Sequence, residues 1–384
     1  MREFTFQNPT RIIFGKGQIQ SLRDQIPADA RILMLAGGGS IKTNGVYQQV
    51  REALSERTWV EHWGIEPNPD VTGILPALEL VRSERVNFLL AVGGGSVVDA
   101  AKFLAGIAVT AGEPLALLAR GGRFTGALPL GVVLTAPGTG SESNSTGAIS
   151  NRATSQKQIF SSPHCFPQFA ILDPECTYTL PAKHVANGVV DAYTHVLEQY
   201  LTYPTGGMLS DRIAEGILVT LRECGPLALL EPDNFVIRAN LMWSATLALN
   251  GLIGLGVPQD WTTHHIGHEL TALFGIDHAR SLAAVMPSVM KARRQQKAEK
   301  ILQYGARVFG IQEGDLDHRI DSTIQQTRKF FESLGLQTRL GAYGISEADI
   351  PRIIANLKGA RRVRLGERLD VTLEQVAGIL KDAI

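Results

Sequence analysis

The sequence has few cysteines and no excess of charge of either sign. Its three cysteines, Cys165, Cys176 and Cys224, are an odd number and lack the close spacing of a zinc ribbon. They indicate reduced thiols of a cytosolic protein rather than a disulfide framework. Lysine plus arginine and aspartate plus glutamate number 37 each. This balance excludes the strong positive charge with which proteins bind nucleic acid or anionic membranes, so we expect neither partner.

Long hydrophobic runs are also missing. The least polar stretch, residues 243–257, contains Asn250 and is interrupted by glycine and proline, so it is too short and too broken to span a bilayer. We interpret it as a buried core helix. The N-terminus lacks the charged-then-apolar pattern of a signal peptide. We therefore expect a cytoplasmic protein.

A chain of 384 residues exceeds the size that one hydrophobic core usually serves, which predicts two domains. Residues 1–180 alternate between short apolar runs and amphipathic stretches. This alternation is typical of an α/β layer with a mostly parallel sheet, in a Rossmann-like nucleotide-binding domain. The expected strands are 31–36, 60–63, 87–92, 128–136 and 169–172, and the expected helices are 46–56, 71–82 and 96–108.

Residues 181–384 have a different pattern, because the strand-like runs disappear after Pro181 and helical periodicity takes over. Glycine, proline or asparagine separates the periodic segments. We therefore expect an all-helical second domain. Its predicted helices are 186–201, 211–221, 238–252, 261–274, 281–309, 320–334 and 373–380.

Two expected strands end in the same tetrapeptide, Gly-Gly-Gly-Ser, at 37–40 and 93–96. Three glycines let a ligand approach the backbone, and the helix that starts near Ser96 points its N–H groups at the same spot, which suits a diphosphate. A third turn offers the hydroxyls of Thr135, Thr139 and Ser141. Because the Gly-x-Gly-x-x-Gly fingerprint is absent, each turn alone is equally consistent with a tight turn that binds nothing. Three such turns at strand ends favour a ligand.

The first turn also indicates which nucleotide is preferred. NAD sites usually place a carboxylate near the adenosine ribose, whereas the 2′-phosphate of NADP requires neutral or basic surroundings. The turn at 37–40 is followed by Lys42, and the next acidic residue is Glu52. This pattern favours NADP(H), unless a carboxylate reaches the turn from another part of the fold.

Aspartate and histidine recur at helical spacing in the second domain. Asp191 and His195 are four residues apart, as are His264 and His268, so each pair projects from one face of its helix. His278 follows after a glycine. One carboxylate and several imidazoles form a donor set that suits Zn²⁺ or Fe²⁺. A simple surface pair on a helix is the alternative for either pair taken alone.

Four motifs in this order resemble the iron-type (group III) alcohol dehydrogenases: Gly-Gly-Gly-Ser-Val-Val-Asp at 93–99, the hydroxyl turn at 135–142, residues 187–195, and the histidines at 264, 268 and 278. The resemblance begins near residue 11 and covers nearly the whole chain. Within the family the chain looks most like the NADPH-dependent aldehyde reductase or butanol dehydrogenase branch. The resemblance implies a dehydroquinate-synthase-like architecture, NADP(H), and one divalent ion, Fe²⁺ or Zn²⁺. We also expect a homodimer.

The resemblance implies roles for individual residues as well. His268 matches a family histidine near the substrate that takes part in proton relay and is not a ligand. Pro137 and Gly138 depart from the alanine and glycine that are more usual in the hydroxyl turn. The implied metal ligands are Asp191, His195, His264 and His278. Together with the glycine turns, the expected cofactor contacts are Gly37, Gly38, Gly39, Ser40, Gly94, Gly95, Ser96, Asp99, Thr135, Thr139, Ser141 and Lys157.

These expectations describe an enzyme that transfers hydride between a nicotinamide and a carbonyl carbon, interconverting aldehydes and primary alcohols and working as an aldehyde reductase. The alternative is a dehydroquinate-synthase-like lyase. Its phosphate-bearing substrates require basic residues around the metal, and none occurs within 187–200 or 261–278. A metal-binding module without catalysis is a third possibility, and it predicts no NADPH turnover.

Overall fold

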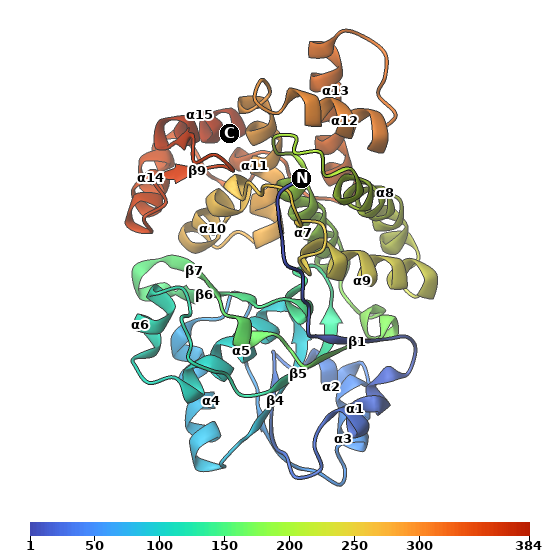
Figure 1. Cartoon of the computed structure of the whole chain (residues 1–384), viewed down its shortest axis with the longest axis vertical. Coiled ribbons are helices and arrows are strands. Elements are labelled where there is room, and N and C mark those ends of the chain that lie inside the picture. The colour runs from blue at the N-terminus through green and yellow to red at the C-terminus, as the bar shows by residue number, and fades with distance from the viewer. The chain divides into compact units, whose positions relative to one another are not determined.

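The computed structural model describes all 384 residues, and contacts within the chain define two compact units (Figure 1). The helical unit comprises Met1–Phe6, Pro181–Glu231 and Leu247–Ile384, and the sheet unit comprises Gln7–Leu180 and Pro232–Thr246. The sheet unit thus includes a segment from well beyond residue 180, and the helical unit includes the extreme N-terminus. The sequence pattern predicted each domain as one continuous stretch. It therefore did not indicate that residues 1–6 belong with the helical unit or that residues 232–246 belong with the sheet unit.

Six parallel strands form the sheet of the sheet unit. They are β1 (Arg11–Phe14), β2 (Arg31–Ala36), β3 (Thr58–His62), β4 (Phe88–Gly94), β5 (Leu130–Ala136) and β8 (Phe169–Leu172). Their order is β1-β8-β5-β4-β2-β3, and all pairings are parallel. An antiparallel hairpin of β6 (Thr146–Asn151) and β7 (Gln156–Ser161), which the sequence analysis did not anticipate, follows β5.

Helices cover both faces of this sheet. They are α1 (Leu22–Gln25), α2 (Ser40–Thr43), α3 (Val46–Ala53), α4 (Val71–Ser83), α5 (Gly95–Val109) and α6 (Pro114–Ala119). Successive residues of a strand point to opposite faces. In β2, Leu33 and Leu35 therefore join a core with α4 and α5, whereas Ile32 and Met34 join a core with α1 and α3. Burial on both faces explains why the inner strands read as nearly continuous apolar runs.

The helices of the remaining chain are α7 (Ala182–Tyr200), α8 (Met208–Leu230), α9 (Phe235–Leu249), α10 (Thr262–Phe274), α11 (His278–Ala292), α12 (Ala298–Val308), α13 (Leu316–Ser333), α14 (Ile350–Gly359) and α15 (Leu373–Ala383). The single helix expected at 281–309 is wrong, because the polar stretch between Ala292 and Ala298 turns and separates α11 from α12. The second domain is also not entirely helical, since β9 (Arg364–Leu365) and β10 (Val371–Thr372) pair. Strands of two residues are too short to leave a periodic pattern.

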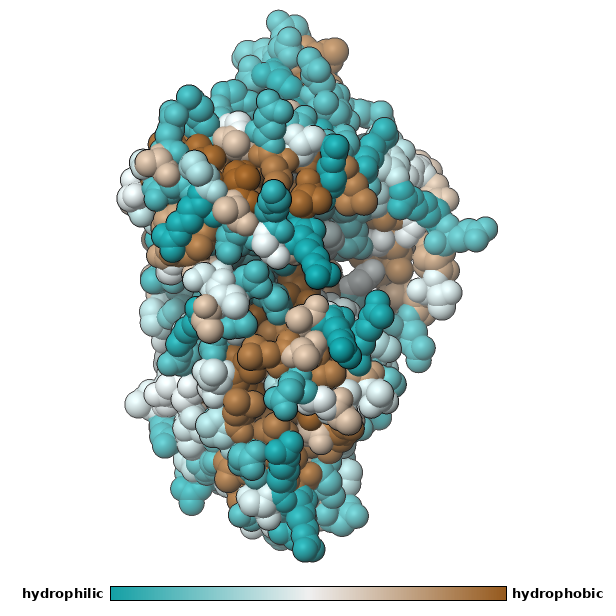
Figure 2. Space-filling model, turned by 90° about the vertical axis from the view of Figure 1, so that its left-hand side faces the viewer, coloured by the Kyte–Doolittle hydropathy of each residue, from teal (hydrophilic) through white to brown (hydrophobic).

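The surface mixes both kinds of side chain. On the face that Figure 2 shows, hydrophilic residues are spread throughout, and hydrophobic residues reach the surface in patches between them. None of the helices has both the length and the apolar character required to cross a membrane.

Candidate functional site

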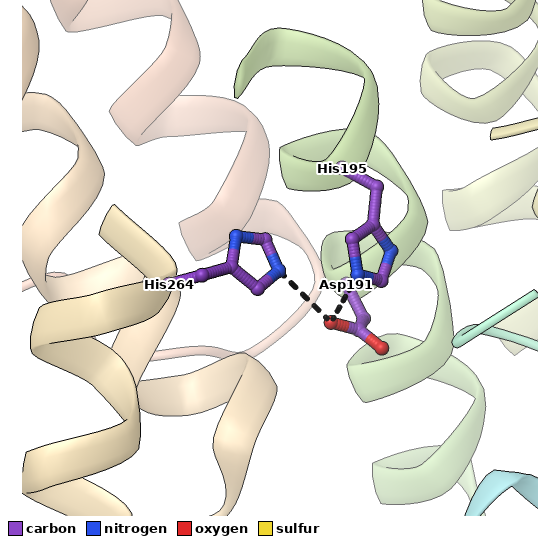
Figure 3. Close-up of side chains that lie close together, drawn as sticks. All are labelled: Asp191, His195 and His264. Atoms are coloured by element: carbon purple, nitrogen blue, oxygen red, sulfur yellow. Dashed lines mark ion pairs between the residues drawn. The ribbon is translucent and has the colours of Figure 1, made fainter. Parts of the chain in front are cut away.

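Two helices of the helical unit bring a carboxylate and two imidazoles together. Asp191 and His195 lie one turn apart on α7, and His264 lies in the first turn of α10 (Figure 3). One ligand atom from each of the three residues lies within 4.8 Å of the other two. All three side chains are buried. Burying ionisable groups is costly unless a partner compensates, and a cation is such a partner.

His278, the first residue of α11, approaches the same carboxylate from a third helix. The Nε2 atoms of His195, His264 and His278 each lie 3.9 Å from Oδ1 of Asp191. These distances are too long for hydrogen bonds. They are near the ligand–ligand separation of about 3.4 Å around a tetrahedral ion with bonds of about 2.1 Å. His278 is more exposed than the other three and lies outside the tight group of three.

The donor chemistry fits a divalent transition-metal ion. Nε2 of His264 is buried and makes no hydrogen bond, although buried polar atoms rarely lack one. One carboxylate and three imidazoles are ligands that both Zn²⁺ and Fe²⁺ accept. The indole of Trp261 stands edge-on to the rings of His195 and His264, with centroid distances of 6.2 and 5.3 Å. The indole therefore covers part of the group with an aromatic surface.

The other two histidines of α10 have different surroundings. His268 is buried, and its ring stacks on that of His278 with 4.9 Å between the centroids. It therefore adjoins the expected ligands without belonging to the tight group. Burial, and secondarily the nearby Arg362, lowers the pKa of the His265 imidazole to about 3. His265 is thus a neutral packing residue.

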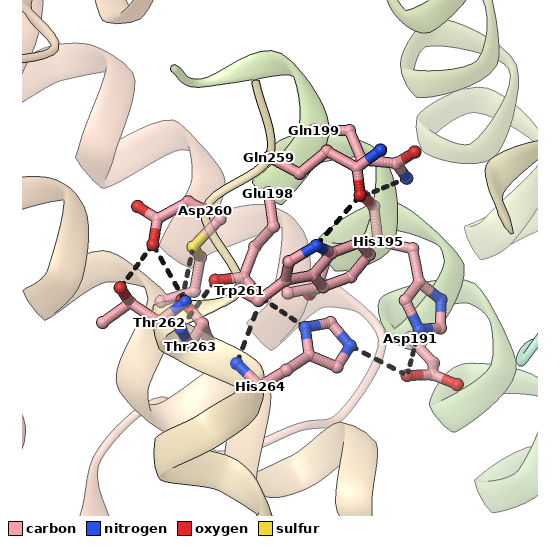
Figure 4. A network of polar contacts seen from close by, with 12 residues as sticks. Asp191, His195, Glu198, Gln199, Gln259, Asp260, Trp261, Thr262, Thr263 and His264 are labelled. Atoms are coloured by element: carbon pink, nitrogen blue, oxygen red, sulfur yellow. Dashed lines mark hydrogen bonds and ion pairs between the residues drawn. The ribbon is translucent and has the colours of Figure 1, made fainter. Parts of the chain in front are cut away.

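Glu198, which the sequence analysis did not single out, contacts the group directly. It lies on α7 and is 3% exposed. Its carboxylate accepts a hydrogen bond from Nδ1 of His264 (Figure 4). It also accepts the backbone N–H groups of Thr263 at 2.6 Å and of His264 at 3.1 Å. A signal for it existed in the sequence, because a glutamate seven residues after Asp191 shares the same helix face.

In the sheet unit, the first two glycine turns differ in how closely they are packed. α5 begins at Gly95, directly after β4, and a Cβ on Gly95 would lie only 2.4 Å from Oγ1 of Thr139. This glycine therefore lets the turn after β5 pack against the start of α5. A Cβ on Gly38 or Gly39 would meet nothing within 4 Å, although Gly39 has a φ of 104° that favours glycine. We call the first turn open, because there is space beside its glycines, and the second turn closed, because Thr139 fills the space beside Gly95.

Buried hydrogen bonds join the hydroxyl turn to α5. Ser141 donates to Oδ1 of Asp99 at 2.5 Å. Lys102, which the sequence analysis did not mention, is fully buried and donates to Ser141, Asn144 and the backbone carbonyl of Thr146 at 2.8–2.9 Å. Burial lowers the pKa of the Lys102 amine to about 8, and burial raises the pKa of the Asp99 carboxyl. Asp99 and Ser141 thus support the turn from its inner side.

Lys157 lies on β7 and reaches toward the start of α5. It donates a hydrogen bond to Oδ1 of Asn68 at 2.8 Å, and the backbone N–H of Asn68 donates to Oγ of Ser96 at 3.3 Å. These contacts bring Lys157 and Ser96 to the same part of the unit. Thr135, near the end of β5, is buried, with 7% of the residue exposed.

A carboxylate does reach the neighbourhood of the first turn. Lys42 lies on α2, and its Nζ is 3.9 Å from the centroid of the Trp63 ring. Glu61, on β3, accepts hydrogen bonds from Tyr47 at 2.6 Å and from the Trp63 indole at 2.5 Å. Each Glu61 oxygen therefore already has an aromatic donor, and Lys42 adds a positive charge beside them.

Comparison with known proteins gives matches along the whole chain. The family model described as iron-containing alcohol dehydrogenase matches residues 9–174, and the C-terminal model of the Fe-containing alcohol dehydrogenase family matches residues 185–384. The NADPH-dependent aldehyde reductase YqhD of Escherichia coli is 52% identical over 377 residues, which is 97% of either chain. The probable NADH-dependent butanol dehydrogenase 1 of Bacillus subtilis is 36% identical over 389 residues, which is 100% of either chain.

Solved structures agree with these matches. The crystal structure of Escherichia coli YqhD has a TM-score of 0.99 at 51% identity and covers 100% of this chain and 99% of that one. The crystal structure of the NADH-dependent butanol dehydrogenase A of Thermotoga maritima has a TM-score of 0.95 at 37% identity, with the same coverage. The expected fold class, a Rossmann-like α/β part followed by a helical part, is confirmed.

Proposed function

Because this chain belongs to the iron-containing alcohol dehydrogenase family, we propose that it is a metal-dependent, NADP(H)-linked aldehyde reductase that interconverts aldehydes and primary alcohols. The observation that carries the proposal is the buried group of Asp191, His195 and His264, with His278 3.9 Å from Asp191. A relative at 52% identity is named as an NADPH-dependent aldehyde reductase. The family matches favour this function over a dehydroquinate-synthase-like lyase.

We assign Asp191, His195, His264 and His278 as the ligands of one divalent ion, Fe²⁺ or Zn²⁺. Such an ion, when bound, supplies Lewis acidity to the carbonyl oxygen of the substrate. The protein's own part is to hold the three imidazoles with Nε2 directed toward Asp191. Because Asp191, His195 and His264 are buried, their charges and dipoles are screened less by water, which strengthens electrostatic interactions at this group.

His268 is assigned to proton transfer. Its side chain is buried and stacks on His278, and no ion pair joins it to Asp191 as one joins His278, so we assign it a role beside the ligands. An imidazole exchanges protons readily near neutral pH, which suits a group that delivers a proton to the alkoxide formed by hydride transfer. Replacing His268 should lower kcat while the bound ion is retained.

The cofactor is assigned to the turns after β2, β4 and β5. The start of α5 offers backbone N–H groups to the diphosphate, and the closed packing of Gly95 against Thr139 fixes that turn. The open first turn leaves room for the 2′-phosphate of NADP(H). Lys42 supplies a positive charge near this turn, and the oxygens of Glu61 are already hydrogen-bonded. These features support NADP(H) over NAD(H).

The substrate is assigned to uncharged short- or medium-chain aldehydes. Apolar residues adjoin the proposed ligands in the sequence of α7 and α10, among them Val190, Val196 and Ile266. No lysine or arginine lies within 187–200 or 261–278 to pair with a phosphate or carboxylate of a substrate. We also propose a homodimer as the working assembly, which light scattering of the purified protein would test.

A combined metal and turnover assay tests the function. Elemental analysis of the purified protein should show one divalent transition metal per chain. NADPH oxidation should be well above background with butanal and much slower with glyoxylate or a sugar phosphate. Faster turnover of the charged substrates, or efficient use of NADH in place of NADPH, would contradict the respective assignment.

A further inference from the structure

Two carboxylates of one helix bracket the imidazole of His264. Nε2 of the ring lies 3.9 Å from Asp191, and Nδ1 makes a hydrogen bond with Glu198 (Figure 4). Asp191 and Glu198 are seven residues apart on α7, two helical turns, and therefore share a face. The same helix thus supplies a proposed ligand on one side of His264 and a hydrogen-bond acceptor on the other.

Glu198 is itself held firmly. Its side chain is 2% exposed, and its two oxygens accept the backbone N–H groups of Thr263 and His264 in addition to Nδ1. N–H groups in the first turn of a helix lack partners within the helix, so these donors are available to Glu198. The backbone carbonyl of Glu198 also accepts a hydrogen bond from the N–H of Asp260 at 2.8 Å. The carboxylate therefore has one orientation relative to α10.

We propose that Glu198 is a positioning residue that sets the tautomer and the ring orientation of His264, an inference that rests on the proposed metal-dependent function. A carboxylate accepts hydrogen bonds and donates none, so Nδ1 must carry the proton. The lone pair is then on Nε2, the atom that faces Asp191. A hydrogen bond from the second ring nitrogen of a ligand to a carboxylate orients the ring and increases its basicity as a ligand.

A glutamine at this position would break the arrangement with little change in shape. Its carboxamide can donate an N–H to Nδ1, which places the imidazole proton on Nε2 and removes the lone pair from the side that faces Asp191. Its remaining oxygen can still accept a backbone N–H from α10. Glu198→Gln therefore changes the tautomer and removes the acceptor of the His264 backbone N–H, while the acceptor of the Thr263 backbone N–H remains.

Asp260 provides a matched control at the same end of α10. It is 5% exposed and accepts the backbone N–H of Thr262 at 2.9 Å. Its other side-chain contacts are with the Thr262 hydroxyl, the Lys297 amine and the Glu367 carboxyl, none of which is a proposed ligand. Asp260→Asn removes a buried charge at this helix end and leaves the imidazole of His264 with its acceptor.

The test is the binding of Co²⁺ to metal-free protein. Titration calorimetry measures the affinity, and the visible spectrum of the bound Co²⁺ reports its coordination. We expect Glu198→Gln to weaken Co²⁺ affinity by about 10–100-fold and to change the Co²⁺ spectrum. Asp260→Asn should lower the melting temperature while Co²⁺ affinity stays at the wild-type value. Wild-type affinity in Glu198→Gln, with only a loss of thermal stability, would overturn the proposal.

A measurement on the wild-type protein decides the question if Glu198→Gln fails to fold. In metal-free protein labelled with ¹⁵N-histidine, at a pH where the imidazoles are neutral, the proton of His264 should reside on Nδ1. A proton on Nε2 would overturn the role of Glu198. Absence of any Co²⁺ binding by wild-type protein would instead overturn the proposed function, so the two failures are distinguishable.

Discussion

The two units of this chain build their candidate sites by opposite means. In the sheet unit the expected cofactor turns consist largely of glycine, and the space left by a missing Cβ, as at Gly95 beside Thr139, is what allows the packing. In the helical unit the candidate metal centre consists of side chains, from Asp191 to His278. The first kind of site should therefore be damaged by adding atoms, and the second by removing them.

The largest effect should come from removing one imidazole. We expect His264→Ala to lose its bound metal and to reduce NADPH-dependent aldehyde turnover by far more than about 100-fold, because a ligand is removed and not only a residue that supports one. Elemental analysis and NADPH oxidation measure this, with circular dichroism as a check on folding. His265→Ala, the neighbouring histidine, should keep its metal. Full metal content in His264→Ala would exclude this residue as a ligand.

Adding one methyl group should damage the sheet unit. In Gly95→Ala the new Cβ would lie 2.4 Å from Oγ1 of Thr139, so we expect a loss of about 1–3 kcal/mol in the free energy of unfolding and weaker NADPH binding. Urea denaturation and fluorescence titration with NADPH measure the two effects.

The control for this change is Gly73→Ala on α4, where a Cβ would meet nothing within 4 Å. It should be neutral or stabilise the protein by about 0.5–1 kcal/mol, since alanine favours the helix. Equal stability of the two variants would mean that the second turn has more room than its contacts indicate.

A side chain added in the open turn should redirect specificity without destabilising the fold. Gly38→Asp places a carboxylate where we expect the 2′-phosphate, and the ratio of kcat/KM for NADPH to that for NADH should fall by about 100-fold, a cost of a few kcal/mol. Gly39 is unsuitable for this change because its φ of 104° would strain any other residue. Gly38→Asn, which has the same size without the charge, should shift the ratio much less. An unchanged ratio in Gly38→Asp would place the 2′-phosphate elsewhere.

The most gradual effect concerns Lys102, a buried side chain of the sheet unit whose contribution changes with pH. Its pKa in the folded protein is lowered from 10.5 to about 8, so between these values the native state binds fewer protons than the unfolded state. The free energy of unfolding should therefore rise with pH in this window, by at most about 1.4 kcal/mol per pH unit. Denaturation at several pH values should show this slope in wild type but not in Lys102→Met. Parallel curves for the two proteins would show that Lys102 does not titrate in this window.

Hydrophobic periodicity and the spacing of polar residues predicted much of the fold and part of the candidate site. Alternation along residues 1–180 predicted the parallel sheet, because strands buried on both faces leave continuous apolar runs such as Arg31–Ala36. The i,i+4 spacing of Asp191 and His195 predicted that they share a helix face, and in the structure they lie together with His264. Predictions from local patterns of this kind are correct because they depend only on the geometry of a single helix or strand.

The features that the sequence analysis missed depend on contacts between distant segments. Glu198 becomes significant only when α10 places His264 against it, and Glu61 reaches the first turn only because β3 pairs with β2.

Other elements were missed for local reasons. α14 has Pro351 in its first turn, which resembles a helix breaker in the sequence, although a proline is tolerated there. The hairpin of β6 and β7 is mostly polar on one side and has no long apolar run to reveal it.

Because the sheet unit includes Pro232–Thr246, it cannot be separated from the helical unit by cutting the chain at one place. Met242 packs in one of the two cores of the sheet, and the Thr246 hydroxyl donates at 2.6 Å to Glu142, which is 1% exposed. A recombinant fragment that stops at Leu180 would leave a gap in that core and a buried carboxylate without its donor. A transplantable cofactor-binding module must therefore carry this segment as well, for example on a new linker that joins Leu180 to Pro232.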